Sequence, residues 1–556
     1  MDDHTRVLVL GLDGYDPGFA ESLLTEGRMP NLARLIADSA RATLDHGKHR
    51  LTGLSWEHFA TGLTPDELQR WSAVSFDPAT YRVQQPTTTA APFLASLGDD
   101  VVVFDPPYFD LGRAPRALGL VNWGAHDPGV AAMSRPANLQ SEVAYRFGTY
   151  PGAKYIYGFV WPSEQQAKAA AEALTQAVSL RTEISRWLLA ERLPDWKVAC
   201  IVVGELHSVI EPMWHGIDAS HPLHGLPSAT AAAHGVRSVY LALDDMIGTL
   251  REAFPDATLV AFCMHGMGAN NADVASMLLL PEFCYRRAFG QPLFSPRPAW
   301  VGPFKTDGTP PQLDDGDKWE AAVRRCFPLS LRLCARLRKS LGKLPRPLRA
   351  AHAHAHREAA GAANLDWMPA TAYAPCWPAM DAFALPSFYD GRIRVNLAGR
   401  ERLGRIAIED YYRFRDALEA ELVALRNPAT GEPAVEELHH PHRDDPRQLH
   451  DTEPDIEIVW RQATLTALAS NRLGTIGPAP IRRTGGHTGG HGVLYLLNSP
   501  LPAGDYGHHS AFDVAPTVAE LAGDPDFARL SGRSLLAVDG KGKAAPEASS
   551  ALTSSA

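Results

Sequence analysis

Near its N-terminus the chain reads Arg6-Val-Leu-Val-Leu-Gly-Leu12, and Asp13-Gly14 follows at once. An uninterrupted apolar run of this kind is typical of a strand inside a parallel sheet, where helices cover both faces. Helical stretches such as 164–192 and 230–254 alternate with such runs, so the sequence predicts an α/β fold with a central, mostly parallel sheet between helices. The other apolar runs of this pattern are 101–104, 198–203 and 258–262.

The composition excludes several classes of protein. With 45% hydrophobic and 21% charged residues, the 556-residue chain has the profile of a soluble globular protein. Its 63 acidic residues outnumber the 53 basic ones, and the net charge of −10 disfavours a nucleic-acid polymer or an anionic membrane as partner. Six cysteines without paired spacing exclude a disulfide scaffold, whereas 22 histidines leave metal or proton-transfer chemistry open.

The N-terminal sequence carries no recognisable targeting segment. Asp2 and Asp3 replace the basic start that a signal peptide needs, and the apolar run 7–12 is too short for a signal peptide or a membrane span. We therefore expect a cytoplasmic protein without a membrane partner.

Polar residues follow the predicted strands at the edge where such sheets bind ligands. Asp13, Glu205 and His265 each come directly after an apolar run, and the carboxyl ends of parallel strands meet at one edge of the sheet. We expect these three side chains to lie near one another.

The segment after run 198–203 is the richest in potential ligands. His207, Glu211 and His215 recur every four residues, so on a helix they share one face, and Glu205 and Asp218 lie close by. Imidazole and carboxylate together suit zinc, manganese or iron. The alternative is a hydrogen-bonded polar network at the end of a strand.

Two shorter segments add a hydroxyl group and further imidazoles. The segment 51–62 contains Thr52 and Ser55, which are potential nucleophiles if a base or a metal activates them, and helix N-caps otherwise. The glycine-rich loop 485–492 carries His487 and His491 but lacks the lysine spacing of a P-loop. It is a ligand-binding loop or a flexible hairpin.

Taken in order, these segments resemble the alkaline phosphatase superfamily, in particular its type I phosphodiesterase/nucleotide pyrophosphatase branch. Asp13-Gly14 after the first strand looks like the first metal-ligand motif of that family, and Thr52 stands ten residues before Gly62, as the family's nucleophilic threonine does. The resemblance implies that Thr52 is the nucleophile and that His487 is the last metal ligand. Further matching segments are Met29-Pro-Asn-Leu-Ala-Arg-Leu35, Arg392-Ile-Arg-Val-Asn-Leu-Ala-Gly-Arg400 and Asp513-Val-Ala-Pro-Thr517.

The sequence departs from the family at the metal ligands. Where the family has Asp-His-Gly, this chain has Met264-His265-Gly266, and a thioether cannot replace the charge of a carboxylate. The family's Asp-x-x-x-His pair matches either Glu211-x-x-x-His215 or His207-x-x-x-Glu211, with residue types changed in both cases. His491 competes with His487 for the final ligand position.

Three arrangements of the site remain open. One metal is held by Glu211, His215 and His487, or two metals bind with Glu205 or His207 as the missing donor. In the third arrangement no metal binds and the histidines act as general acid, general base and anion contacts. The segment 48–50 (Lys-His-Arg) then adds positive charge, although a solvated basic turn is the plainer interpretation.

The resemblance also implies the organisation of the chain. We expect residues 1–280 to form the first part of an alkaline-phosphatase-like core, 281–480 an inserted cap with some core elements, and 481–540 the C-terminal part of the core. Independently of the resemblance, the Ala/Ser-rich composition of 541–556 predicts a disordered tail. The histidines outside these motifs are expected to be solvated, namely those of the Ala-rich segment 352–356 and His439, His440 and His442.

We therefore predict a metal-dependent hydrolase of phosphate diesters or related phosphate and phosphonate esters, acting on a small molecule through a covalent intermediate on Thr52. The cofactor is one or two divalent ions, with zinc expected and manganese or iron as alternatives. The alternative functions are a phosphoryl- or sulfuryl-type group transferase and a non-catalytic binding protein. The predicted metal ligands are Asp13, Thr52, His207, Glu211, His215, His265 and His487.

A formylglycine sulfatase is disfavoured by the sequence. Such enzymes need Cys or Ser in a C/S-x-P-x-R pattern, and Cys326-Phe-Pro-Leu-Ser330 comes nearest but ends without the arginine.

Overall fold

The computed structural model describes residues 6–98, 100–124, 131–156, 163–314, 317–330, 365–441 and 443–537. The histidine segment 352–356, His442 and the predicted tail 541–556 lie outside these ranges.

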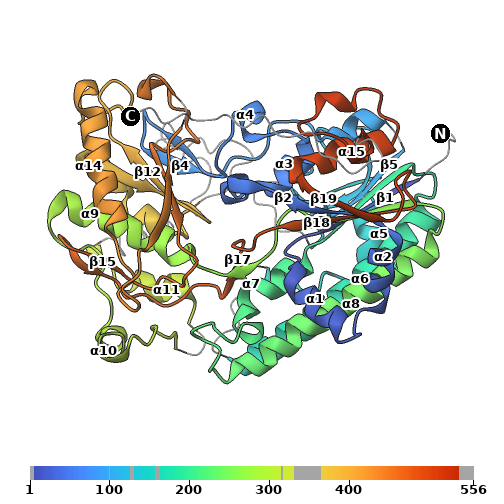
Figure 1. Cartoon of the computed structure of the whole chain (residues 1–556), viewed down its shortest axis with the longest axis horizontal. Helices are drawn as coiled ribbons and strands as arrows, with labels where there is room; N and C mark the ends of the chain where they lie inside the picture. Colours follow the sequence, from blue (N-terminus) through green and yellow to red (C-terminus); the bar gives the residue numbers. More distant parts are fainter. Residues whose placement is uncertain are drawn as a thin grey trace, which may run out of the picture.

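A nine-stranded sheet forms the centre of the larger lobe, on the right in Figure 1, with the strand order β19-β2-β18-β9-β1-β8-β5-β6-β7. Neighbouring strands run parallel from β9 to β6 and again between β19 and β2, whereas β18 and β7 are antiparallel to their neighbours. The predicted α/β fold with a mostly parallel sheet is confirmed. The strands are β1 (Val7–Leu12), β2 (Ala40–Asp45), β5 (Val101–Phe104), β6 (Leu118–Val121), β7 (Met133–Arg135), β8 (Val198–Val203), β9 (Thr258–Cys263), β18 (Gly492–Leu497) and β19 (Gly504–Ser510).

Helices cover both faces of this sheet because its central strands are apolar on both sides. In β1, Leu8 and Leu10 pack into one hydrophobic core and Val7 and Val9 into the other, as the two-residue period of a strand requires. The first core lies under α1 (Pro17–Thr25), α2 (Pro30–Asp38), α5 (Leu139–Phe147), α6 (Glu164–Trp187), α7 (Glu205–Ile217) and α8 (Ser228–Ala253). The second lies under α3 (Ser55–Thr61) and α15 (Val514–Leu521).

The smaller lobe, on the left in Figure 1, consists of elements between Leu280 and Ile476, and we call it the cap. It is built on an antiparallel sheet of the order β11-β12-β14-β13 and has a hydrophobic core of its own. The cap contains α9 (Leu280–Phe289), α10 (Pro298–Asp307), α11 (Trp319–Arg324), β11 (Ala382–Leu385), β12 (Gly391–Val395), α14 (Tyr411–Val423), β13 (Val435–His439), β14 (Ile456–Trp460), β15 (Leu468–Ser470) and β16 (Gly474–Ile476).

Short elements connect the two lobes. The ribbon of β10 (Gly268–Ala269) and β17 (Gly485–Gly486) lies between them beside α7 and brings the glycine-rich loop to the end of β9. A Cβ atom at Gly489 would lie 2.3 Å from the carbonyl carbon of Gly266, so only glycine permits this close approach. The remaining elements are α4 (Pro65–Leu68), β3 (Ser75–Asp77) and β4 (Arg82–Gln84).

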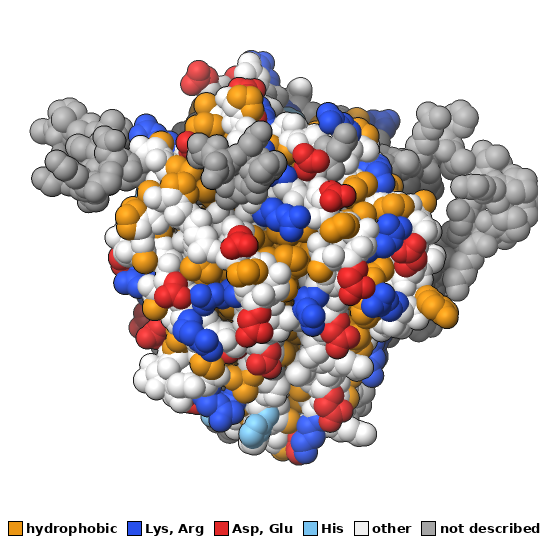
Figure 2. All heavy atoms as spheres, turned by 90° about the vertical axis from the view of Figure 1, so that its right-hand side faces the viewer, with side chains coloured by type: hydrophobic (Ala, Val, Ile, Leu, Met, Phe, Trp, Pro, Cys, Tyr) orange, Lys and Arg blue, Asp and Glu red, His pale blue; other side chains and the backbone are white. Residues whose placement is uncertain are grey.

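One face of the larger lobe is mixed in charge. Figure 2 shows basic and acidic side chains interspersed over its outer face, unlike the one-sign surface that favours polyanion binding. Among the helices of the described ranges, none combines the length and the apolar character needed to span a bilayer.

Candidate metal centre

The sheet brings three predicted site segments to one edge. Strands β9, β1 and β8 are parallel neighbours whose registers pair Gly11 with Phe262 and Leu12 with Val203. Asp13 therefore follows β1 beside the start of α7, and His265 follows β9 on the other side. The ends of these three strands are neighbours, whereas the carboxylate of Glu205 contacts Arg181 at 2.8 Å.

A glycine allows the turn after β1 to contact α7. Gly14 has φ +77°, and a Cβ atom at this position would lie 2.3 Å from the Cα atom of His207. Any side chain here would push α7 away from the strand end, so Gly14 fixes the distance between Asp13 and His207.

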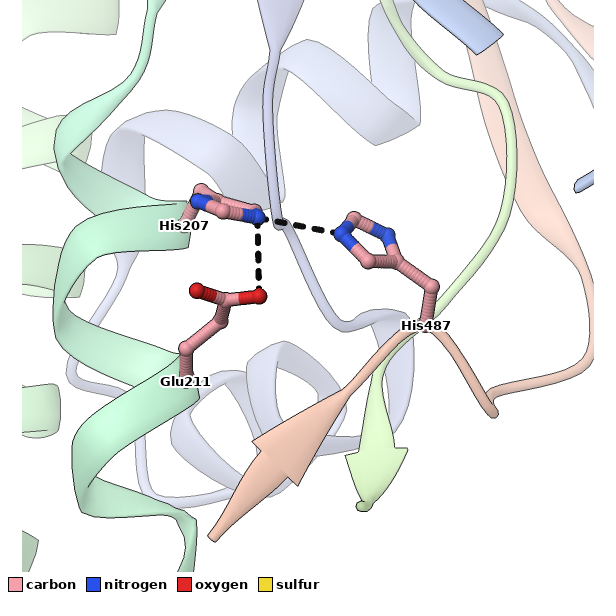
Figure 3. Close-up of side chains that lie close together, drawn as sticks. All are labelled: His207, Glu211 and His487. Atoms are coloured by element: carbon pink, nitrogen blue, oxygen red, sulfur yellow. Dashed lines mark hydrogen bonds and ion pairs between the residues drawn. The ribbon is translucent and has the colours of Figure 1, made fainter. Parts of the chain in front are cut away.

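His207, Glu211 and His487 form a compact cluster, which we call the three-residue group. The Nε2 atom of His207 lies 3.0 Å from Nε2 of His487 and 3.2 Å from Oε1 of Glu211, and one ligand atom from each residue lies within 4.8 Å of the others (Figure 3). His207 and Glu211 are one turn apart on α7, whereas His487 comes from the glycine-rich loop. Two imidazoles and one carboxylate are a ligand set of catalytic zinc sites, which keep a further position open for water or substrate.

A buried ion-pair network holds the carboxylate of this group. Arg483 forms an ion pair with Glu211, and its Nε atom lies 2.9 Å from Asp273, which Arg482 contacts at 2.8 Å. Burial alone would raise the pKa of Glu211, but Arg483 and His207 hold it well below its usual range. Burial likewise acts to lower the pKa of His207, but Glu211 and Asp13 raise it. Glu211 is therefore ionised, which a metal ligand has to be.

His265 extends the cluster from the end of β9. Its Nε2 atom lies 2.8 Å from Nδ1 of His487, and its Nδ1 atom is buried with no hydrogen-bond partner among the described residues. Burial, with Arg50 and His207 nearby, lowers the pKa of His265 to about 3. The imidazole is therefore neutral, the form that binds metal ions.

The two remaining predicted residues of the phosphatase motif lie at the same edge. Thr52 ends the 3₁₀ helix Gly47–Thr52, where its hydroxyl donates a hydrogen bond to the carbonyl of His49 (2.8 Å) and accepts one from the amide of Leu54 (3.2 Å). Asp13 is 4% exposed. Burial raises the pKa of Asp13, and His207 and a hydrogen bond from Trp56 partly offset this.

His215 lies apart from the three-residue group. It is one turn beyond Glu211 on α7, and its ring nitrogens lie 3.3 Å from the hydroxyl of Thr484 and 3.1 Å from that of Ser228. The family's ligand pair had two candidate matches on α7, His207 with Glu211 and Glu211 with His215. The structure brings the first pair together with His487.

Other candidate residues also have partners elsewhere. The carboxylate of Glu205 contacts Arg181 through atoms 2.8–3.2 Å apart, and the ring of His491 packs on His508 at 5.1 Å. His439 and His440 lie in the cap, where they pair with Glu437 and Glu419.

Residues that the sequence did not single out complete the site. Tyr389, from the turn between β11 and β12, places its ring 4.8 Å from that of His487 in an edge-on arrangement. A Cβ atom on Gly53 would lie 3.4 Å from the Tyr389 ring, so this cap side chain lies next to the residue after Thr52. Burial and nearby Glu211 raise the pKa of Tyr389 above its usual range, so the phenol stays protonated. The only sequence signal for Arg483 is its position just before the glycine-rich loop.

Comparisons with known proteins give matches in structure only. No protein-family model matches the sequence, and no curated protein is significantly similar to it. Phosphonoacetate hydrolase from Sinorhizobium meliloti, solved with phosphonoformate, is 14% identical with a TM-score of 0.44, over 93% of this chain and 96% of that chain. An inactive murine ectonucleotide pyrophosphatase/phosphodiesterase 5 with AMP is 9% identical with a TM-score of 0.44, over 93% and 95%.

A mutant of the alkaline phosphatase PafA is 11% identical with a TM-score of 0.43, over 96% of this chain and 98% of that chain. All three proteins belong to the alkaline phosphatase superfamily, the group that the sequence motifs resemble. Because the TM-scores are below 0.5 and the identities below 15%, the function has to be inferred from the side chains of the site itself.

Proposed function

We propose that this chain is a metal-dependent hydrolase of phosphate diesters or related phosphate and phosphonate esters. The observation that carries the proposal is the three-residue group, in which two imidazoles and an ionised carboxylate converge near Asp13. Tyr389 connects this group to the residue after Thr52. A divalent ion, with zinc favoured by this ligand set, supplies a Lewis acid for the phosphoryl oxygen. Neighbouring side chains hold two of these ligands in place: Arg483 pairs with Glu211, and His265 contacts His487.

Thr52 is the proposed nucleophile. Its Oγ1 atom forms a bond to phosphorus, the bond from phosphorus to the leaving oxygen breaks, and the leaving alkoxide takes up the hydroxyl proton. A water molecule then attacks phosphorus, the bond to Oγ1 breaks, and Thr52 regains a proton from that water. Because the hydroxyl proton points to the carbonyl of His49, this hydrogen bond has to break before attack. Asp13 follows β1 and His265 follows its parallel neighbour β9, so both lie at the same edge and are available to position the reacting group.

A single ion fits the structure better than two. Met264, at the position of the missing carboxylate, packs in the apolar core under α3 and α15 and is 5% exposed. Its thioether therefore adds no ligand to the position bounded by Asp13, Thr52 and His265. We assign the ion to the three-residue group, with His207 in place of the His215 of the one-metal arrangement considered from the sequence.

Elemental analysis combined with diester turnover tests this proposal. The wild type should bind one zinc per chain and hydrolyse bis(p-nitrophenyl) phosphate, and His487→Ala should lose both. His491→Ala is the matched control because His491 belongs to the same loop but packs on His508. Unchanged turnover after complete metal removal, or zinc retained by His487→Ala, contradicts the proposal.

The cap gives a specific reason to test group transfer as a second function. Tyr389 covers the backbone next to Thr52, and a covered intermediate is protected from water. If an alcohol acceptor replaces water, Tyr389→Ala should raise the ratio of hydrolysis to transfer, measured by product analysis in glycerol. An unchanged ratio would leave hydrolysis as the reaction.

A further inference from the structure

A second cluster of side chains lies beyond His265, outside the three-residue group. Ser55 is the first residue of α3, His46 precedes the 3₁₀ helix Gly47–Thr52, and His58 lies one turn along α3. The Oγ atom of Ser55 lies 3.3 Å from Nδ1 of His46, and Nε2 of His46 lies 3.2 Å from Nδ1 of His58. We call these residues the Ser–His–His chain.

The two imidazoles of the chain are buried, whereas Ser55 is only half-buried. His46 and His58 are 3% and 2% exposed, and their rings meet edge-on at 5.3 Å. The ring of Phe512 packs against both, at 5.3 and 5.5 Å. Ser55 is half-buried, so the hydroxyl lies at the margin of the cluster and the imidazoles lie inside it. A nucleophile next to a base that a third group orients is the arrangement of a catalytic triad.

The hydroxyl of neighbouring Thr52 has different contacts from that of Ser55. Its hydroxyl is bonded on both sides to backbone atoms, the carbonyl of His49 and the amide of Leu54. Ser55, three residues later, contacts the ring of a histidine instead. Of these two hydroxyls, Ser55 is the one that lies against a side-chain base.

Arg50 adds a donor beside the chain. Its Nη1 atom donates to the carbonyl of Gly47 at 2.9 Å, whereas its Nε atom is buried without a hydrogen-bond partner in the described part of the chain. Arg50 belongs to the turn that joins His46 to Thr52. Burial, with His58, His265 and Arg50 nearby, holds the pKa of His46 well below its usual range, so the imidazole is neutral and able to accept a proton. This buried N–H group, in the turn that carries His46, is the donor available to a developing oxyanion.

We propose that Ser55, His46 and His58 form a second catalytic site, which hydrolyses small carboxylic esters without a metal ion. A neutral ester has no charge that a metal has to neutralise, so the hydroxyl, the base and one donor meet the needs of acyl transfer. This activity differs from the proposed phosphoester hydrolysis in needing no metal ion, although the ring of His46 stacks on that of His265 at 5.8 Å.

The reaction proceeds in two balanced steps. In the first, Ser55 Oγ bonds to the acyl carbon while its proton passes to Nδ1 of His46, and the ester C–O bond breaks as the leaving alkoxide takes that proton. In the second, a water molecule gives a proton to His46 and attacks the acyl carbon. The bond to Ser55 breaks, the serine regains the proton, and the carboxylic acid leaves. The Nε2–H group of His46 points to His58 throughout.

The test uses the full-length chain after removal of metal with a chelator, and p-nitrophenyl acetate as the probe. Ser55→Ala and His46→Gln should each lower the rate by about a hundredfold or more, the contribution typical of a catalytic base or its nucleophile. Ser22→Ala is the control, because Ser22 is exposed on α1 and its hydroxyl donates to a backbone carbonyl. A Ser55→Ala rate equal to that of the wild type overturns the proposal.

Labelling of the unmodified protein makes the test independent of how the variants fold. Phenylmethylsulfonyl fluoride transfers its sulfonyl group to an activated serine with loss of fluoride. Peptide mapping by mass spectrometry should find the adduct on Ser55. No adduct, or an adduct on another residue, contradicts the proposal. Because the probe and the ester act without metal, either result leaves the phosphoester hydrolase proposal untouched.

Discussion

Replacing Arg483 with methionine removes the guanidinium that holds Glu211 in the three-residue group. Arg483 forms ion pairs with Glu211 and with Asp273, and all three side chains are at most 3% exposed. Removing one partner of a buried ion pair destabilises a protein by about 3–5 kcal/mol. Asp273 keeps Arg482 at 2.8 Å and Glu211 keeps His207 at 3.2 Å, so we expect a loss near the lower limit, about 3 kcal/mol.

Arg483→Met should also weaken zinc binding. A residue that orients a metal ligand typically contributes about 10–100-fold to metal affinity, and we expect a loss in this range. Urea unfolding at pH 7 measures the stability, and competition with a chelator measures the affinity. Zinc at about 100 times its dissociation constant should restore about 2.7 kcal/mol to either protein, because only the folded state has the assembled site.

Arg482→Met is the matched control for this experiment. Arg482 contacts Asp273 at 2.8 Å and Glu320 at 3.5 Å, so its loss disturbs the same network from the side away from the three-residue group. It should lower stability but leave zinc affinity within about twofold of the wild type. If Arg483→Met has the urea midpoint and the zinc affinity of the wild type, the network does not support a metal centre.

The other predictions concern the nucleophile, acid stability and the turn after β1. Thr52→Ala should lower diester turnover by roughly 10³-fold or more while Thr52→Ser retains part of it, and wild-type turnover in Thr52→Ala would exclude this nucleophile. Burial lowers the pKa of both His215 and His265 to about 3, whereas the unfolded chain protonates them near pH 6.5. The free energy of unfolding should therefore decrease as the pH drops below about 6.5, by about 1.4 kcal/mol per pH unit for each residue. His215→Gln should flatten this dependence in urea unfolding between pH 7 and 5, and an unchanged slope would contradict the assignment. Gly14→Ala should lower the melting temperature and zinc affinity more than Gly27→Ala, which has a similar φ of +69° but nothing within 4 Å of the added Cβ atom. Equal effects of the two changes would show that contact with α7 is unimportant.

The edge of the sheet that carries the site was predictable from local sequence. Apolar runs define β1, β8 and β9, and the rule that ligands bind at the carboxyl ends of parallel strands places Asp13 and His265 together. The period of four residues in α7 likewise predicts a ligand face. Both follow from patterns within about ten residues, which a sequence displays directly.

The choice of ligands on that face was not predictable. His207, Glu211 and His215 share one side of α7, and the spacing treats them alike. The outcome depends on which neighbours reach each turn: His487 arrives at His207, whereas Thr484 and Ser228 arrive at His215. These contacts join residues up to 280 positions apart, and packing of the whole chain determines them.

Contributions from the cap were hidden for the same reason. Tyr389 belongs to a turn between two cap strands, and only the arrangement of the two lobes places its ring against His487. The Ser–His–His chain was partly visible, since Ser55 is a hydroxyl in a turn, but its base lies nine residues earlier and on another element.

Crystallography of the zinc-loaded protein with anomalous data at the zinc edge tests the proposed metal centre most directly. We predict one anomalous peak per chain, within about 2.0–2.2 Å of Nε2 of His207, a carboxylate oxygen of Glu211 and Nε2 of His487. The same data from His487→Ala should lack this peak. A zinc-loaded crystal with no peak between these three residues, or with zinc bound only elsewhere, would contradict the account.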